Sequence, residues 1–410
     1  MRKTRIGLLL AAALVAAPVP ADARVKLAAL PKRERIEIQL DHGRYTLVEE
    51  ERIVPLLRST AERGNNAIDF SWSNVHIDKD SIQFRPLAIR EGGKFRPLRD
   101  GEVNVINVSY PPGENSLVWE VHAKKACAVK ARVSYLIANL TRSFSYRALA
   151  DNEEKFLVLK NYLQLRNYSG EEFGSAGVWA GFGPRFVKQV DNQTDIKMLL
   201  HRFARVPIRK TFSFDWYAHG RLNPDKPFAS RVLMHYELMN DEAHGLGKFP
   251  MQPGKARIFI RDGRGGEAFL GEDWAKLTPL DGRMRLYLGD ARDVVCTRKI
   301  KSNKRHAVRG NLFDQEIRIT YECENFKDKP ATLDIVEQLN RLARQYGADP
   351  KGDVQWEPGA DTSKEIRLTY ERGRATPILH IDLPARPTDK AAKVEKRTYV
   401  LHLTLKNLWK

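Results

Sequence analysis

Residues 399–405 read Tyr399-Val400-Leu401-His402-Leu403-Thr404-Leu405, a run in which leucines recur at every second position. The same two-residue period occurs at residues 36–40, 103–108 and 156–159. Alternate side chains of a β-strand point to opposite faces, so this pattern predicts strands with one apolar face. Such strands bury that face by packing sheet on sheet. We therefore predict a mainly β fold of tandem antiparallel β-sandwich domains with one or two short helices.

Turn signals separate the alternating runs at a spacing of roughly ten residues, which is typical of antiparallel sheets. Pro111-Pro112-Gly113, Asp262-Gly263-Arg264-Gly265-Gly266 and Asp281-Gly282 each stand between apolar runs. We expect a hairpin to reverse direction at these places.

Two segments show helical spacing instead. In residues 191–205, Ile196, Leu199, Leu200 and Phe203 follow the candidate caps Asn192 and Thr194, which predicts one amphipathic helix. A second pattern runs from Leu333 to Tyr346 and stops at Gly347, although its beginning fits a strand equally well.

The chain begins with the features of a secretory signal peptide. Basic residues precede an apolar run from Ile6 to Ala17, and small residues stand before a predicted cut between Ala23 and Arg24. The twelve apolar residues are too few for a spanning helix, which needs about 20. We therefore predict an exported protein, periplasmic or extracellular, without a membrane span after cleavage. Residues 24–410 leave room for three domains, with predicted bounds 24–125, 126–235 and 236–410.

The composition is strongly basic. The chain holds 69 Lys+Arg and 51 Asp+Glu, a formal charge of +18, of which +16 remains after the predicted cleavage. A positive surface attracts polyanions, and export removes cytosolic nucleic acid from the candidates. We expect an anionic envelope polymer, an acidic polysaccharide or lipid head groups as the partner. The alternative is that the charge serves solubility alone.

Three cysteines, Cys127, Cys296 and Cys323, allow at most one intramolecular disulfide. Cys296 and Cys323 both fall in strand-like runs on either side of one turn. If these strands form an antiparallel hairpin with its tip near residues 303–312, the two sulfurs lie at the same level. We predict a Cys296–Cys323 disulfide, and two buried thiols remain the alternative.

The same hairpin carries a basic run without an acid between Asp293 and Asp314. We predict that it forms a cationic finger that binds anions, because Arg and Lys make charge-assisted hydrogen bonds to phosphate and carboxylate. A solvated loop kept soluble by its charge is the alternative. The candidate anion-binding residues are Arg298, Lys299, Lys301, Lys304, Arg305 and Arg309.

Four segments follow one another along the chain at residues 165–173, 246–250, 286–294 and 316–325. In this order they resemble segments of an uncharacterised, mostly bacterial family, domain-of-unknown-function family 4139, the group of mucoidy inhibitor A-like proteins. The resemblance implies tandem β-sandwiches, with Leu333 to Leu339 as a strand, and it implies no established chemistry.

No motif in the chain predicts a reaction, a metal site or a cofactor. The adjacent acids Glu171-Glu172 and Glu272-Asp273 point to opposite faces of a strand, so neither pair forms an acid/base couple by itself. Our interpretation is a non-catalytic binding or structural protein of the cell envelope. The alternatives are an assembly subunit that joins neighbours through strand edges, and a glycan-acting hydrolase whose cleft is lined by aromatic residues. The tryptophans available for such a lining are Trp72, Trp119, Trp179, Trp216, Trp274 and Trp356.

Overall fold

The computed structural model describes residues 24–27, 33–40, 43–219, 228–370, 375–388 and 393–409. The chain divides into two compact units. Unit 1 comprises residues 1–142 and 165–196, and unit 2 comprises residues 143–164 and 197–410. The predicted boundary after residue 125 lies inside unit 1, and the predicted boundary after residue 235 lies inside a strand of unit 2. The predicted cut between Ala23 and Arg24 concerns residues 1–23, which lie outside the described part of the chain.

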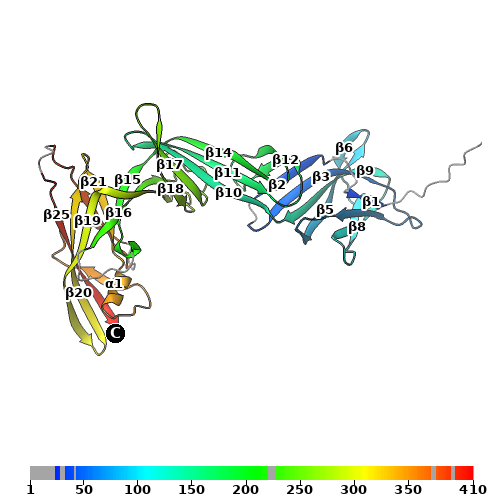
Figure 1. Cartoon of the computed structure of the whole chain (residues 1–410). Helices are drawn as coiled ribbons and strands as arrows, with labels where there is room; N and C mark the ends of the chain where they lie inside the picture. Colours follow the sequence, from blue (N-terminus) through cyan, green and yellow to red (C-terminus); the bar gives the residue numbers. More distant parts are fainter. Residues whose placement is uncertain are drawn as a thin grey trace, which may run out of the picture. The chain divides into compact units, whose positions relative to one another are not determined.

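The predicted mainly β fold is confirmed: the described residues form four sheets, drawn as arrows in Figure 1. The runs at residues 103–108, 156–159 and 399–405 lie in strands, as do residues 36–39 of the run at 36–40, and Leu40 directly follows that strand. Most neighbouring strands are antiparallel, but each of the four sheets also contains a parallel pair. Among the described residues, no helix is long and apolar enough to cross a membrane.

Unit 1 contains a seven-stranded and a four-stranded sheet. Across the larger sheet the order is β13 (Phe186–Val190), β12 (Gly174–Trp179), β2 (Arg35–Gln39), β3 (Thr46–Leu56), β9 (Cys127–Ile137), β5 (Ile77–Glu91) and β6 (Lys94–Pro97). Across the smaller sheet it is β1 (Arg24–Lys26), β4 (Asn66–Ser71), β8 (Ser116–Ala123) and β7 (Val103–Ser109).

Aromatic side chains join the two sheets of unit 1. The rings of Phe84 and Trp119 lie 5.1 Å apart between centroids, and those of Phe70 and Tyr135 lie 5.7 Å apart. Phe84 and Tyr135 belong to the larger sheet, whereas Phe70 and Trp119 belong to the smaller one. The buried faces of both sheets therefore share one core, as expected for a β-sandwich.

Unit 2 contains the greater part of a five-stranded sheet, three strands of which begin or end in unit 1. The order across this sheet is β14 (Thr194–Pro207), β11 (Phe156–Asn167), β10 (Leu140–Ala150), β17 (Gly254–Arg261) and β18 (Glu267–Ala275).

A nine-stranded sheet forms the remainder of unit 2. Its order is β22 (Gln355–Pro358), β25 (Arg397–Trp409), β20 (Leu312–Asn325), β19 (Arg283–Arg309), β16 (Phe228–Met239), β15 (Arg209–Phe214), β21 (Ala331–Val336), β24 (Ile378–Leu383) and β23 (Arg367–Thr369). A 3-10 helix, η2 (Trp216–His219), follows β15, and α1 (Leu339–Gln345) follows β21. Figure 1 shows β19 and β20 as a long two-stranded ribbon beside α1.

The helix predicted for residues 191–205 is wrong, because most of this segment is strand β14. Met198 and Leu200 are buried, whereas Leu199 between them is 45% exposed. A helix would instead have placed Leu199 and Leu200 on one buried face. Irregular spacing after Leu200, with Phe203 as the next buried residue of the strand, produced the apparent helical period.

The second helical pattern divides into a strand and a helix. Leu333 lies in β21, which ends at Val336, and the single described α-helix begins at Leu339. The strand expected from the family resemblance is therefore confirmed as far as Val336. Positive φ at Gly347 (81°) fits the predicted stop, since glycine adopts this conformation without strain.

A buried ion pair stabilises the core under the nine-stranded sheet. The Arg298 guanidinium donates to both carboxylate oxygens of Glu337, at 2.7 and 3.0 Å, and the two side chains are 4% and 0% exposed. The Tyr321 hydroxyl donates to Glu337 at 2.5 Å, and the Trp216 indole NH donates to it at 3.1 Å. Burial disfavours the Arg298 charge, but the attraction of Glu337 outweighs this and raises the pKa of Arg298.

We predict that Glu337→Gln destabilises the protein by about 3–5 kcal/mol, because the buried Arg298 charge loses its counter-ion while the side-chain shape is kept. Guanidinium unfolding followed by tryptophan fluorescence measures the change. The matched control is Glu322→Gln on β20, whose 3.4 Å pair with Lys396 is solvent-exposed. This control should change stability by less than about 0.5 kcal/mol. Equal stabilities of the two variants would contradict a structural role for the buried pair.

Candidate functional site

The predicted hairpin around the basic run is confirmed. β19 and β20 pair antiparallel as far as Arg309 opposite Leu312. The turn between them consists of Gly310 and Asn311, and Gly310 has a positive φ of 57°. The tip therefore lies within the predicted range, residues 303–312.

The prediction of a cationic finger is wrong for Arg298. This residue faces the core and is 5% exposed, with its guanidinium held by Glu337 and stacked 3.9 Å from the Trp216 ring centre. The sequence did not reveal this position, because Glu337 lies 39 residues further along the chain. Arg298 is thus a structural residue rather than a surface contact for an anion.

The other five residues of the run are exposed, but they do not form one cationic face. Lys304 lies opposite Glu316 on β20, and His306 lies opposite Asp314. The neighbouring strand thus supplies the acids that the run itself lacks. Anion binding by this hairpin stays a prediction for its exposed residues, which are Lys299, Lys301, Lys304, Arg305 and Arg309.

Arg305 is also engaged within the protein. Its guanidinium stacks over the Phe313 ring at 4.0 Å and donates to the Tyr346 carbonyl at 2.6 Å. These contacts hold the side chain against the end of the sheet, which reduces its reach toward a ligand.

Cys296 and Cys323 are register partners in the same hairpin. Their sulfurs lie 3.5 Å apart and are not bonded, and both residues are fully buried. Burial and the adjacent Cys323 sulfur raise the pKa of the Cys296 thiol well above its usual range. Cys127 begins β9 in unit 1 and is partly exposed. The predicted disulfide is therefore sterically accessible, and its formation stays a prediction.

A different surface gathers cations and aromatic rings, namely one face of the five-stranded sheet in unit 2. We call it the outer face. Its charged and aromatic residues are Arg147, Phe156, Lys160, Tyr162, Lys197, Arg205, Lys255, Arg257, Phe259, Arg261, Glu267, Phe269, Glu272 and Trp274.

Strand alternation separates the outer face from the core. On β10, Tyr146 and Ala148 are buried while Arg147 between them points to the other side. The buried side packs on residues 246–251, where the Phe203 and Phe249 rings lie 6.0 Å apart. Because an antiparallel or mixed sheet needs only one apolar face, the opposite face is available for other chemistry.

Cations on the outer face stack on its aromatic rings. Each of the three pairs joins side chains from two different strands, so the pairs hold both the rings and the charges in place. Measured from the cation to the ring centre, they are Lys197 over Tyr162 at 4.4 Å, Arg205 over Phe156 at 3.9 Å and Arg147 over Phe259 at 4.5 Å.

The outer face continues to the edge strand β18. Phe269 and Trp274 are 59% and 62% exposed there. Glu272 binds Lys255 at 2.9 Å and Arg257 at 3.0 Å, and these two hydrogen-bonded cations lower the pKa of Glu272. The edge thus combines exposed rings with cations that outnumber the local carboxylates.

This arrangement can bind a polymer that carries both charges and flat rings. Arg and Lys attract and hydrogen-bond anionic groups, while exposed aromatic rings stack on flat faces with little dependence on exact identity. The strands lie about 4.8 Å apart, so contacts repeat across the sheet. Such a repeated surface fits an extended chain better than a single small molecule.

The outer face was not predicted from the sequence, for two reasons. The helix predicted for 191–205 removed Lys197 and Arg205 from the sheet, and parallel pairing of β10 with β17 brings Arg147 beside Arg257 from a distant segment. The alternation of Lys197 and Leu199 with Met198 and Leu200 was the signal that could have revealed part of it.

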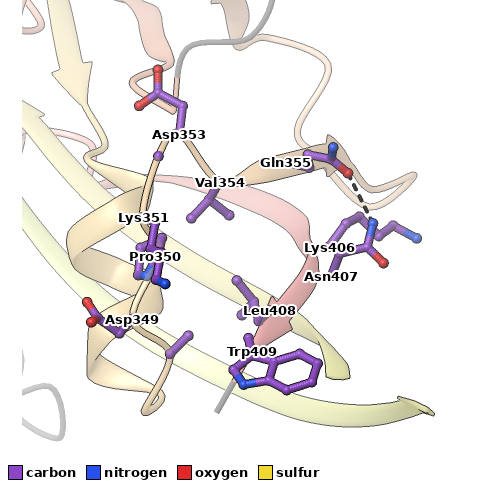
Figure 2. A pocket seen from close by; sticks show the side chains of 12 residues that line it. Asp349, Pro350, Lys351, Asp353, Val354, Gln355, Lys406, Asn407, Leu408 and Trp409 are labelled. Atoms are coloured by element: carbon purple, nitrogen blue, oxygen red, sulfur yellow. Dashed lines mark hydrogen bonds between the residues drawn. The ribbon is translucent and has the colours of Figure 1, made fainter. Parts of the chain in front are cut away.

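A cavity of about 580 Å³ lies in unit 2 between the segment after α1 and the end of β25. Figure 2 shows Val354 and Leu408 facing each other in it, while the Asp349 and Asp353 carboxylates project away from Trp409. A binding site needs polar groups that converge on a ligand. Since the carboxylates diverge, we do not assign this cavity a function.

We predict that protein purified without reductant contains the Cys296–Cys323 disulfide, because aligned sulfurs need only a small shift to bond. Peptide mapping should find these two cysteines joined, with a mass lower by two hydrogens. Reduction should lower the free energy of unfolding by about 2–4 kcal/mol, since the bond closes a loop in the unfolded chain.

Cys127→Ser is the matched control, and it should leave the linked peptide unchanged. Alkylation of all three cysteines in unfolded, unreduced protein would contradict the prediction.

The chain was also compared with known proteins. No protein-family model matches it, and no curated protein matches it significantly.

Proposed function

We propose that the protein is a non-catalytic binding protein of the cell envelope or extracellular space, and that it holds an anionic polymer on the outer face. The observation that carries this proposal is the set of cation–ring pairs on one exposed side of the five-stranded sheet.

Charge supports an anionic ligand. The whole chain has a formal charge of +18, which attracts polyanions at long range and raises the rate of encounter. On the outer face, alternate positions of β17 are occupied in turn by Lys255, Arg257, Phe259 and Arg261, three of them cationic. The carboxylates Glu267 and Glu272 neutralise only part of this charge.

Several classes of polyanion could bind the cations and aromatic rings of the outer face. The predicted export reduces the number of these classes. Single-stranded nucleic acid would suit aromatic rings and cations equally well. An exported protein meets anionic polysaccharides and envelope polymers instead. We therefore favour a polymer whose carboxylate, phosphate or sulfate groups bind the cations and whose rings stack on Phe269 and Trp274.

The proposal of an envelope location rests on the signal peptide predicted for residues 1–23. Membership of domain-of-unknown-function family 4139 remains part of the same proposal, supported by the ordered sequence segments.

We predict that the variant Lys197→Gln, Arg205→Gln, Arg257→Gln elutes from a heparin column at lower salt than the unchanged protein. Each removed cation eliminates a contact that releases counter-ions, so retention should also depend less steeply on salt. Far-UV circular dichroism should be unchanged, because the three side chains are exposed.

The matched comparison is Lys301→Gln, Lys304→Gln, Arg305→Gln, which removes the same charge from the β19–β20 hairpin. We expect a smaller shift for this variant, since Lys304 lies opposite Glu316 on β20 and the Arg305 guanidinium is held by the Tyr346 carbonyl. A larger shift would assign binding to the hairpin, and identical elution of all three proteins would refute specific polyanion binding.

A further inference from the structure

A second site lies in unit 1, where a polar pocket of about 390 Å³ opens at the border between its two sheets. This volume falls within the range of roughly 300–1,000 Å³ typical of small-molecule sites. Glu50 and Arg52 from β3 and Tyr135 from β9 line one side, and Phe70 and Trp72 at the end of β4 line the other.

The inner end of the pocket is a network of hydrogen-bonded charges. Glu50, whose side chain is 2% exposed, accepts from Tyr135 at 2.7 Å and from Arg52 at 3.0 Å. Arg52 also donates to the Leu27 carbonyl at 2.9 Å. Desolvation by burial, together with Glu50, raises the pKa of Tyr135 well above its usual range, so its hydroxyl keeps its proton. These side chains are therefore fixed before any ligand arrives.

The outer end of the pocket is a second, more accessible ion pair. Arg33 donates to Glu171 and to the Glu172 carbonyl, and its Nε lies 3.6 Å from Glu50. The Arg33 and Glu171 side chains are 26% and 28% exposed. They can therefore contact both the inner network and a bound molecule.

A network of the same three side-chain types, an arginine, a glutamate and a tyrosine, also occurs in the core of unit 2. There the arginine, glutamate and tyrosine are Arg298, Glu337 and Tyr321, and Trp216 covers the carboxylate. In unit 1 the network borders a cavity, and Trp72 is a partly exposed wall beside it. The network of unit 2 is enclosed by the core, so its contribution to stability is enough to explain it. The network of unit 1 borders a cavity, and stability of the core does not require that cavity.

The pocket's charges indicate an uncharged ligand. Arg33 and Arg52 balance Glu50 and Glu171, so a charged ligand would bring an uncompensated charge into a partly desolvated site. A molecule with several hydroxyl groups can instead donate to the carboxylates and accept from Arg33. The aromatic wall, with the Phe70 and Trp72 rings 5.9 Å apart, suits a flat apolar ring face.

We propose that this pocket binds one uncharged pyranose residue, free or within a glycan. The C–H face of the sugar ring stacks on Trp72, and its hydroxyls bind Glu171 and Arg33. Both carboxylates are held by arginine, so they serve as hydrogen-bond acceptors and the pocket binds the sugar without cleaving it. The site is separate from the outer face, and it requires a different ligand chemistry.

Saturation-transfer NMR on the full chain, with glucose, galactose, N-acetylglucosamine and glucuronate as probes, tests the proposal. We expect saturable binding of at least one neutral sugar and weaker binding of glucuronate. Trp72→Ala should weaken binding tenfold or more, about 1.4 kcal/mol. Glu171→Gln, which preserves the pocket shape, should weaken it to a smaller extent.

Trp409→Ala at the end of β25, which is 62% exposed and belongs to neither proposed site, is the matched control, and it should leave sugar binding unchanged. Trp72→Ala should likewise leave heparin retention unchanged, so the two proposals fail independently. Lack of saturable binding by every neutral sugar would overturn the proposal. So would binding that neither Trp72→Ala nor Glu171→Gln affects, or release of reducing sugar from an oligosaccharide probe.

Discussion

Burial of one face per sheet is the constraint on which the rest of this structure depends. A strand satisfies its backbone by pairing with neighbours, but its apolar side chains leave water only when another layer covers them. In the five-stranded sheet, Ala256 and Ile258 meet this need, whereas Arg257 between them is free to remain in solvent. The core therefore does not determine the residue types on the opposite face. Cations and aromatic rings can collect there at no cost to the packing beneath them.

Buried charge is the main departure from this arrangement, and it occurs in both units. An ion pair inside a protein recovers its desolvation cost only when its hydrogen bonds are well formed. Glu337 meets that condition with four donors, and Glu50 meets it through Arg52 and Tyr135. Each glutamate connects residues from elements distant in sequence. Such networks favour one arrangement of the strands over others of similar hydrophobic burial, which gives them a role in fold specificity.

The sequence predicted what depends on local pattern and failed where distant strands meet. Alternation of apolar and polar residues located most strands. It also placed Cys296 opposite Cys323, because the two strands of a hairpin are close together in the sequence. Arg298 was assigned to the surface because nothing near it in sequence identifies Glu337 as its partner. The basic run looked uniformly positive since the acids that face it lie on the returning strand. The irregular spacing of β14 hid the outer face. Neither the outer face nor the unit 1 pocket was predicted, because each is assembled from segments far apart in the chain.

The division of the chain between its two units also affects how the protein can be made. The chain leaves unit 1 after Arg142, returns at Leu165 and leaves again after Ile196, so no single cut yields both units intact. Synthesis from the N-terminus completes β10 long before it supplies β17, the parallel neighbour of β10. Until then the nascent chain exposes an unpaired strand edge of the kind that aggregates or recruits chaperones. Holding the emerging polypeptide unfolded until residue 261 has appeared would avoid that hazard.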